Sequence, residues 1–176
     1  MTLRYRWAAA ATAVTLLLAL LVLAPERARA ASLRVVTDPT GDTRDPATKQ
    51  PVNDPRSDAL EASAEYRTDA IVLRIKAADP RNLKTDADFY PDPSEISWGI
   101  DTTGDFKLDY QVDYGLDAGE LFAEVYPADA PPEAEAICQG TPRFIDGYYQ
   151  ATLDPNCLGS PDRFYFSAAL LIFCRR

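Results

Sequence analysis

The sequence contains no histidine among its 176 residues. This absence excludes Ser–His and Cys–His nucleophile pairs, and it excludes zinc sites that are ligated by histidine. A glycine-rich phosphate loop and a nucleophile elbow are also absent. Paired carboxylates remain available for a glycosidase mechanism, but the sequence does not show which two would face each other. We therefore expect that the protein is not an enzyme.

Basic residues are scarce, and several of them lie within the first 31 residues. Arg4 and Arg6 precede an apolar run over 8–23, and the small residues Ala28 and Ala30 follow it. This order is typical of a secretory signal peptide, and it predicts that residues 1–31 direct secretion to the extracellular space, with cleavage near the end of the segment. Because the apolar run is barely long enough to span a bilayer, an uncleaved anchor is the alternative.

The remaining chain, residues 32–176, is strongly acidic. Cleavage removes four arginines and one glutamate from totals of 18 basic and 27 acidic residues, which leaves a net charge of −12. Such a surface repels phosphate backbones and anionic headgroups, so neither nucleic acid nor a membrane surface is an expected partner. The length fits one domain, and no internal repeat or low-complexity linker indicates a second one.

Cysteine is limited to three residues. Cys138 and Cys157 flank a segment, 144–153, that has the pattern of a turn followed by a strand, and export would place both thiols in an oxidising compartment. We predict a disulfide between them, and two buried free thiols are the alternative. Cys174 is left over, either unpaired or paired between chains.

No stretch after residue 31 has the period of a long amphipathic helix, and the dominant period is two. The alternation is clearest where apolar residues at 106, 108, 110, 112 and 114 alternate with polar ones. Strands are predicted at 32–37, 60–67, 71–77, 95–101, 106–114, 120–126, 147–153 and 163–173. Short strands with Pro, Gly and Asp in the gaps predict an all-β fold, a single antiparallel β-sandwich of jelly-roll-like type.

Two acidic loops could bind a metal. Asp101 and Asp105 flank a Thr-Thr-Gly segment ahead of Asp109, and Asp38 and Asp42 flank a similar Pro-Thr-Gly segment. Carboxylates spaced closely around a glycine can converge several oxygens, as a Ca²⁺ ion requires, so these five aspartates are candidate calcium ligands. The alternative is ordinary turn chemistry, because Asp and Gly are favoured in β-turns, and the spacing is not that of an EF-hand.

Most aromatic residues lie on predicted strands, where they alternate toward a core. Phe89 and Tyr90 differ, because they stand in a proline-flanked acidic loop, 86–93. An exposed aromatic ring beside carboxylates is suited to stacking against a sugar, whereas a plug under the sandwich edge is the alternative. If the protein binds a glycan, Phe89, Tyr90 and Tyr149 are the expected ligand contacts.

Several short motifs together resemble secreted bacterial modules of the CBM9-like and DOMON-like β-sandwich group. They are Asp38-Pro39-Thr40-Gly41-Asp42, Ser57-Asp58-Ala59-Leu60-Glu61-Ala62, Trp98-Gly99-Ile100-Asp101, Leu108-Asp109-Tyr110 and Cys157-Leu158-Gly159-Ser160-Pro161. The resemblance implies a β-sandwich that binds carbohydrate or haem or has a structural role, with calcium held away from the ligand in several members. Haem ligation in that group uses Met and His, which residues 32–176 lack.

These observations lead to two functional hypotheses. The first is a secreted non-catalytic module that binds an extracellular ligand such as a carbohydrate, with calcium stiffening its acidic loops. The second is a structural or adhesion module of the cell envelope that recognises protein. An exposed aromatic groove with polar neighbours would favour the first, and an apolar patch or an unpaired strand edge would favour the second.

Overall fold

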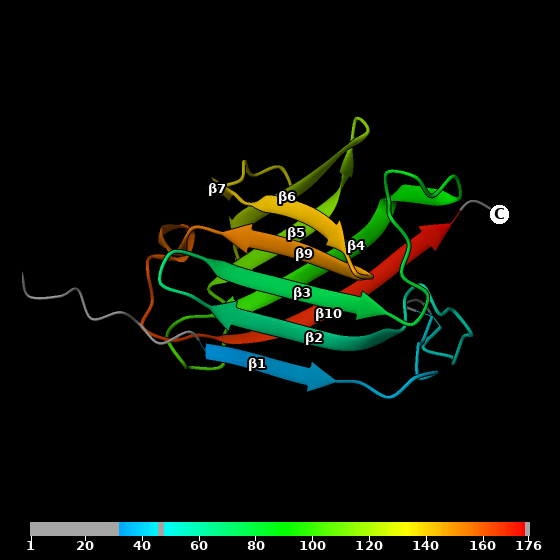
Figure 1. Cartoon of the computed structure of the whole chain (residues 1–176), viewed down its shortest axis with the longest axis horizontal. Helices are drawn as coiled ribbons and strands as arrows, with labels where there is room; N and C mark the ends of the chain where they lie inside the picture. Colours follow the sequence, from blue (N-terminus) through cyan, green and yellow to red (C-terminus); the bar gives the residue numbers. More distant parts are fainter. Residues whose placement is uncertain (1–31, 46–47, 175–176) are drawn as a thin grey trace, which may run out of the picture. The chain divides into compact units, whose positions relative to one another are not determined.

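The computed structural model describes residues 32–45 and 48–174, without the side chains of 90–93 and 173–174, and its strands form two antiparallel sheets (Figure 1). Sheet 1 contains, in spatial order, β1 (Ser32–Thr37), β2 (Ala59–Tyr66), β3 (Ile71–Ala77), β9 (Tyr148–Leu153) and β8 (Thr141–Ile145). Sheet 2 contains β10 (Tyr165–Cys174), β4 (Phe89–Asp101), β5 (Tyr110–Asp117), β6 (Glu120–Pro127) and β7 (Cys138–Gln139). One hydrophobic core joins the sheets, which confirms the predicted all-β sandwich. The predicted signal peptide lies outside the described residues.

Alternation along each strand places one set of side chains between the sheets. On β3, Ile75 is fully buried, whereas Arg74 on the other face is partly exposed. Trp98 of sheet 2 and Tyr149 of sheet 1 are also fully buried. The ring of Tyr149 meets Tyr114 of sheet 2 edge-on, with centroids 5.8 Å apart. Burying a large apolar side chain contributes roughly 1.5–3 kcal/mol, so these residues hold the two sheets together.

The predicted strands are present, most of them within two residues of their predicted limits. β1 and β3 have the predicted limits, and for β3 the alternation is bounded by turn residues, Thr68-Asp69 before it and Asp79-Pro80 after it. The structure adds β7 and β8, which are too short for a period of two to stand out in the sequence.

The segment around Phe89 is not the loop that the prolines suggested. β4 begins at Phe89, and this residue pairs with Cys174 near the end of β10. A register shift between Leu171 and Phe173 allows the pairing to continue past this proline-containing stretch of β4. The predicted loop is therefore wrong for Phe89, but the alternative of a buried ring holds, because the residue is 7% exposed and packs in the core.

The first part of the predicted strand 106–114 is also wrong. β5 begins at Tyr110, and Phe106 is 89% exposed instead of facing the core. The backbone N–H of Phe106 donates to Oδ2 of Asp101 at 2.9 Å, and the residue has a φ of 64°. The Asp101 carboxylate thus draws this backbone into a tight turn, which overrides the alternation that the sequence shows.

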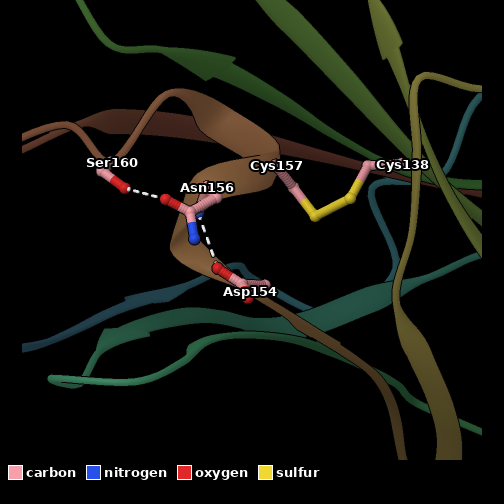
Figure 2. Close-up of a disulfide and its surroundings, with 5 residues drawn as sticks. All are labelled: Cys138, Asp154, Asn156, Cys157 and Ser160. Carbon is pink, nitrogen blue, oxygen red and sulfur yellow. Dashed lines mark hydrogen bonds between the residues drawn. A yellow bond between two sulfur atoms is a disulfide. The ribbon is translucent and has the colours of Figure 1, made fainter.

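The predicted disulfide between Cys138 and Cys157 is present. Cys157 lies in a 3₁₀ helix, η1 (Pro155–Leu158), and Cys138 lies on β7 (Figure 2). Asp154 caps the helix by accepting a hydrogen bond from the N–H of Asn156 at 2.8 Å, and Ser160 donates to the Asn156 side chain at 2.7 Å (Figure 2). The disulfide therefore ties β7, an edge strand of sheet 2, to the turn that follows β9.

Removing this disulfide should destabilise the fold. The two cysteines are 19 residues apart, and closing a loop of this length contributes about 3 kcal/mol in the chain-entropy model. We expect the double variant Cys138→Ser, Cys157→Ser to melt about 10 °C below the oxidised protein in a calorimetric scan. Cys174→Ser should leave the midpoint unchanged, and equal midpoints for the double variant and the oxidised protein would contradict the prediction.

Candidate functional site

The outer face of sheet 1 carries a hollow of about 360 Å³, which we call the sheet-1 hollow. Most of its polar lining comes from the central strands: Glu61 and Ser63 on β2, Arg74 on β3 and Gln150 on β9, with Asp146 in the turn between β8 and β9. Ser63 stands opposite Arg74, and Arg74 stands opposite Gln150. Because directly opposed residues on neighbouring strands point to the same face, the register aligns these side chains in one row across the sheet.

Hydrogen bonds hold this row in place. The Nε of Arg74 donates to Oε1 of Gln150 at 2.8 Å, and the Gln150 amide donates to Oγ1 of Thr152 at 3.2 Å. The other side of the Arg74 guanidinium lies 3.5 Å from a carboxylate oxygen of Glu65. The donors in the hollow are therefore oriented by their neighbours before any ligand arrives.

Tyr148 is the aromatic residue of the hollow. Its side chain is half-buried, and its hydroxyl donates to Oε1 of Glu61 at 3.0 Å. The Nζ of Lys76 lies 5.3 Å from the centre of the ring, within the range of a cation–π contact. Burial, followed by the hydrogen bond to Glu61, raises the pKa of Tyr148. Contacts with Glu61 and Lys76 therefore fix the ring, and the hydroxyl keeps its proton at neutral pH.

Apolar side chains border the hollow at both ends. Leu33 and Val35 of β1 are 56% and 50% exposed, and Ile145 of β8 is 46% exposed. The hollow therefore spans all five strands of sheet 1, with a polar centre between two apolar borders. Five strands at a spacing of about 4.8 Å give a length of about 19 Å, enough for an extended ligand.

The predicted ligand contacts do not meet at the hollow. Tyr149 is fully buried in the core and accepts a hydrogen bond from the N–H of Arg81 through its hydroxyl, and Phe89 is also buried. The exposed alternative is therefore wrong for these two residues, and the buried alternative holds, because the strands that carry them turn their rings between the sheets. The side chain of Tyr90, the third candidate, lies outside the described residues.

The residue that sequence reasoning missed is the neighbouring Tyr148. Its position was open to prediction, because Ala151 and Leu153 have the same parity as Tyr149 and mark the buried face of β9. Gln150 has the same parity as Tyr148 and lies on the opposite face. The alternation therefore assigns Tyr148 to the surface once the apolar face of the strand is identified.

The outer face of sheet 2 has a different character. Asp113 stands directly opposite Glu124, and Glu95 lies nearby on β4. Burial, followed by the charges of Glu95 and Glu124, raises the pKa of Asp113. Tyr126 donates to Glu124 at 2.7 Å, an arrangement similar to that of Tyr148 and Glu61, and this bond raises the pKa of Tyr126 to about 12. Sheet 2 thus places a tyrosine beside two carboxylates, Glu124 and Asp113, and no lysine or arginine of the described residues forms an ion pair with either.

A larger pocket of about 480 Å³ opens at the β1 edge of the sandwich. Arg34 of β1 and Arg163, before β10, contribute to its walls, together with the rings of Tyr66 and Phe164. These two rings pack with centroids 6.0 Å apart. We call this the edge pocket; its side chains lie against β1 instead of forming a row across a sheet.

The candidate calcium ligands of the second acidic loop serve the loop itself. Asp101 is 3% exposed, and its oxygens accept hydrogen bonds from the N–H groups of Thr103, Gly104 and Phe106 at 2.6–3.0 Å. The Oδ2 of Asp109 accepts from the N–H and the hydroxyl of Thr102 at 2.8 and 2.7 Å. Turn chemistry therefore accounts for these two carboxylates.

Asp105 in the same loop accepts from the N–H of Lys107 at 3.0 Å. Among the residues that the structure describes, no three acidic or cysteine side chains form a metal cluster. Calcium binding in the loop that contains Asp101 stays a prediction. The loop that contains Asp38 and Asp42 differs, because a buried carboxylate lies beneath it.

No protein-family model, no curated protein and no solved structure matches the chain. The resemblance to CBM9-like and DOMON-like modules therefore stays an interpretation of short motifs, with which the sandwich of two five-stranded sheets agrees. Within residues 32–45 and 48–174, no helix is both long enough and apolar enough to cross a membrane.

The loop that contains Asp101 and Asp109 should make stability depend on acid pH. Burial opposes the charge of Asp101, but its N–H donors outweigh this effect and lower its pKa; the hydroxyl of Thr102 is the main cause of the lowered pKa of Asp109. A lowered folded pKa stabilises the fold above the unfolded value of about 3.9, and this contribution is lost as the pH falls through the folded pKa.

We therefore expect Asp109→Asn to melt below the native protein at pH 7, and the difference between their midpoints to shrink as the pH is lowered toward 3. Thermal scans at a series of pH values measure this difference directly. A difference that stays constant from pH 7 to pH 3 would show that ionised Asp109 adds nothing to stability.

Proposed function

We propose that the protein is a secreted, non-catalytic module that binds an extracellular carbohydrate in the sheet-1 hollow. The observation that supports this most is the combination of the Tyr148 ring with a row of oriented polar side chains in one open hollow. Sugars present apolar C–H faces together with hydroxyl groups that both donate and accept hydrogen bonds. The hollow supplies a partner for each of these features.

The charges of the hollow suit a neutral ligand. Arg74 and Lys76 partly offset the carboxylates of Glu61, Glu65 and Asp146, so cations and acids are both present in this part of the otherwise acidic chain. Arg74 and Gln150 offer N–H donors, and Glu61 offers acceptor oxygens, at positions set by strands. A site on strands holds its groups more rigidly than a site on loops, which limits the ordering entropy that binding costs.

A binding role fits the hollow better than turnover. A glycosidase places two carboxyl groups across the scissile bond, about 5–10 Å apart. Here Glu61 and Asp146 both line the hollow, but the central strand, β3, also places Arg74 there, and Glu61 accepts a hydrogen bond from Tyr148. The disulfide supports secretion, because such bonds persist in oxidising compartments.

Truncation of Tyr148 should remove carbohydrate binding. Loss of the ring removes a stacking surface and also releases Glu61, so we expect Tyr148→Ala to weaken binding of the best soluble oligosaccharide about tenfold or more, equivalent to about 1.4 kcal/mol. A screen against immobilised glycans identifies that ligand, and isothermal titration calorimetry then measures the affinity of each variant.

Tyr126→Ala is the matched control, because it removes another half-buried tyrosine that donates to a glutamate, on the outer face of sheet 2. Its affinity should equal that of the native protein. If both variants bind with native affinity, or if only Tyr126→Ala loses binding, the sheet-1 hollow is not the carbohydrate site.

A second function, recognition of protein, is favoured by the β1 edge. β1 is the outermost strand of sheet 1, and Val36, which lies outside the hollow, is 57% exposed. An extended segment of a partner protein could add to this edge as a further strand, and the edge pocket beside Arg34 would accept one of its side chains.

Val36→Lys separates the two functions, because a lysine on the edge strand opposes strand addition without altering the hollow. The measurement is adhesion of each variant to purified envelope proteins. If Tyr148→Ala still adheres and Val36→Lys does not, protein recognition is favoured. If Val36→Lys still binds glycan and Tyr148→Ala does not, carbohydrate binding in the sheet-1 hollow is supported.

A further inference from the structure

A buried carboxylate at the start of β2 lacks a partner for one of its oxygens. Asp58 is only 5% exposed. Its Oδ2 accepts a hydrogen bond from the N–H of Gly41 at 2.7 Å, whereas its Oδ1 is buried and has no hydrogen-bond partner. Because an unpaired buried charge is costly, native proteins pair such groups or use them to coordinate metals.

Two further carboxylates lie in the loop that crosses Asp58. The backbone N–H of Asp38 donates to the carbonyl of Leu60 at 2.9 Å, which fixes the beginning of the loop against β2. Asp38 and Asp42 stand on either side of Gly41, whose N–H contacts Asp58, so this loop carries both carboxylates past Asp58. No described lysine or arginine forms an ion pair with any of the three.

A second unpartnered oxygen belongs to the same loop. The Oγ1 of Thr43 is buried and has no hydrogen-bond partner, and Thr43 directly follows Asp42. Gly41, with a φ of 81°, lets the loop turn so that its N–H reaches Asp58. The loop and the carboxylate that Gly41 contacts therefore each contribute a buried oxygen without a partner.

We propose that Asp58, together with Asp38, Asp42 and the hydroxyl of Thr43, binds a calcium ion that fastens the loop between β1 and β2 to the start of β2. Calcium takes six to eight oxygen ligands in flexible geometry, including carboxylates and neutral oxygens, and the chain offers no histidine that a transition metal would prefer. Among the described residues no three acidic side chains already form a metal cluster, so the proposed ion requires Asp38 and Asp42 to move toward Asp58 when it binds.

Asp58 distinguishes this loop from the loop that contains Asp101. Asp101 is just as buried, but both of its oxygens accept hydrogen bonds from its own loop. Asp58 uses one oxygen in this way and leaves the other without a partner. The similar Asp-Gly motifs therefore lead to two roles, a self-contained turn in one loop and a cation site in the other.

The experiment is a thermal scan of the purified full chain in chelator, in 1 mM calcium chloride and in 1 mM magnesium chloride. An ion that binds only the folded state raises the midpoint. We expect calcium to raise it by about 5 °C or more, and magnesium to raise it by much less, because magnesium demands strict octahedral geometry. Titration calorimetry with calcium alone should give a stoichiometry of one.

Three variants assign the ion to Asp58. Asp58→Asn should abolish the calcium response, and Asp42→Asn, at an exposed position that does not threaten folding, should weaken calcium binding about tenfold. Asp105→Asn is the matched control from the other acidic loop and should retain the native response. An unchanged midpoint with calcium, native calcium affinity in Asp42→Asn, or a response that Asp105→Asn abolishes would each overturn the proposal.

Discussion

The register in which β9 pairs with β3 is the constraint on which the core and the proposed site both depend. Tyr149 stands opposite Ile75 inside the sandwich, and Gln150 stands opposite Arg74 outside it. A slip of one residue would turn Arg74 toward the core and Tyr149 toward solvent, so burial of the two apolar side chains fixes the parity of both strands. The same register that buries the core side chains on the inner face of sheet 1 therefore places the side chains of the sheet-1 hollow on its outer face.

The two outer faces of the sandwich show how much the surface charge can differ on one scaffold. Both faces carry a tyrosine that donates to a glutamate, Tyr148 in sheet 1 and Tyr126 in sheet 2. Arg74 and Lys76 partly offset the acidic residues of sheet 1, whereas Asp113 of sheet 2 faces Glu124 directly. A neutral polar ligand therefore meets matched donors and acceptors on sheet 1 and mainly acceptors on sheet 2.

The sequence predicted the fold well because alternation and turn residues act locally. It predicted the disulfide because the expected signal peptide implies an oxidising compartment, and Cys138 and Cys157 flank a turn and a strand. It failed at Phe106, where the carboxylate of Asp101 captures the backbone and ends the strand early, and at Phe89, where pairing with β10 continues an extended segment past prolines. Both failures depend on partners that local patterns do not reveal.

The prediction of the site failed for a different reason. Tyr148 and Tyr149 are adjacent, and the choice between them depends only on which face of β9 is buried, which Ala151 and Leu153 indicate. The unpartnered oxygen of Asp58 was beyond sequence reasoning, because it depends on the path of a loop 17 residues away. Sequence thus predicts which faces exist, and the structure shows which groups meet on them.

The most direct test of the account is a map of the ligand-contacting surface by NMR. Amide signals of the labelled protein are followed during titration with the soluble oligosaccharide that it binds best. The account predicts shift changes that centre on Arg74, Tyr148 and Gln150 and leave Asp113 and Tyr126 unaffected. Changes confined to sheet 2 or to the β1 edge, with the signals of β3 and β9 unmoved, would contradict it.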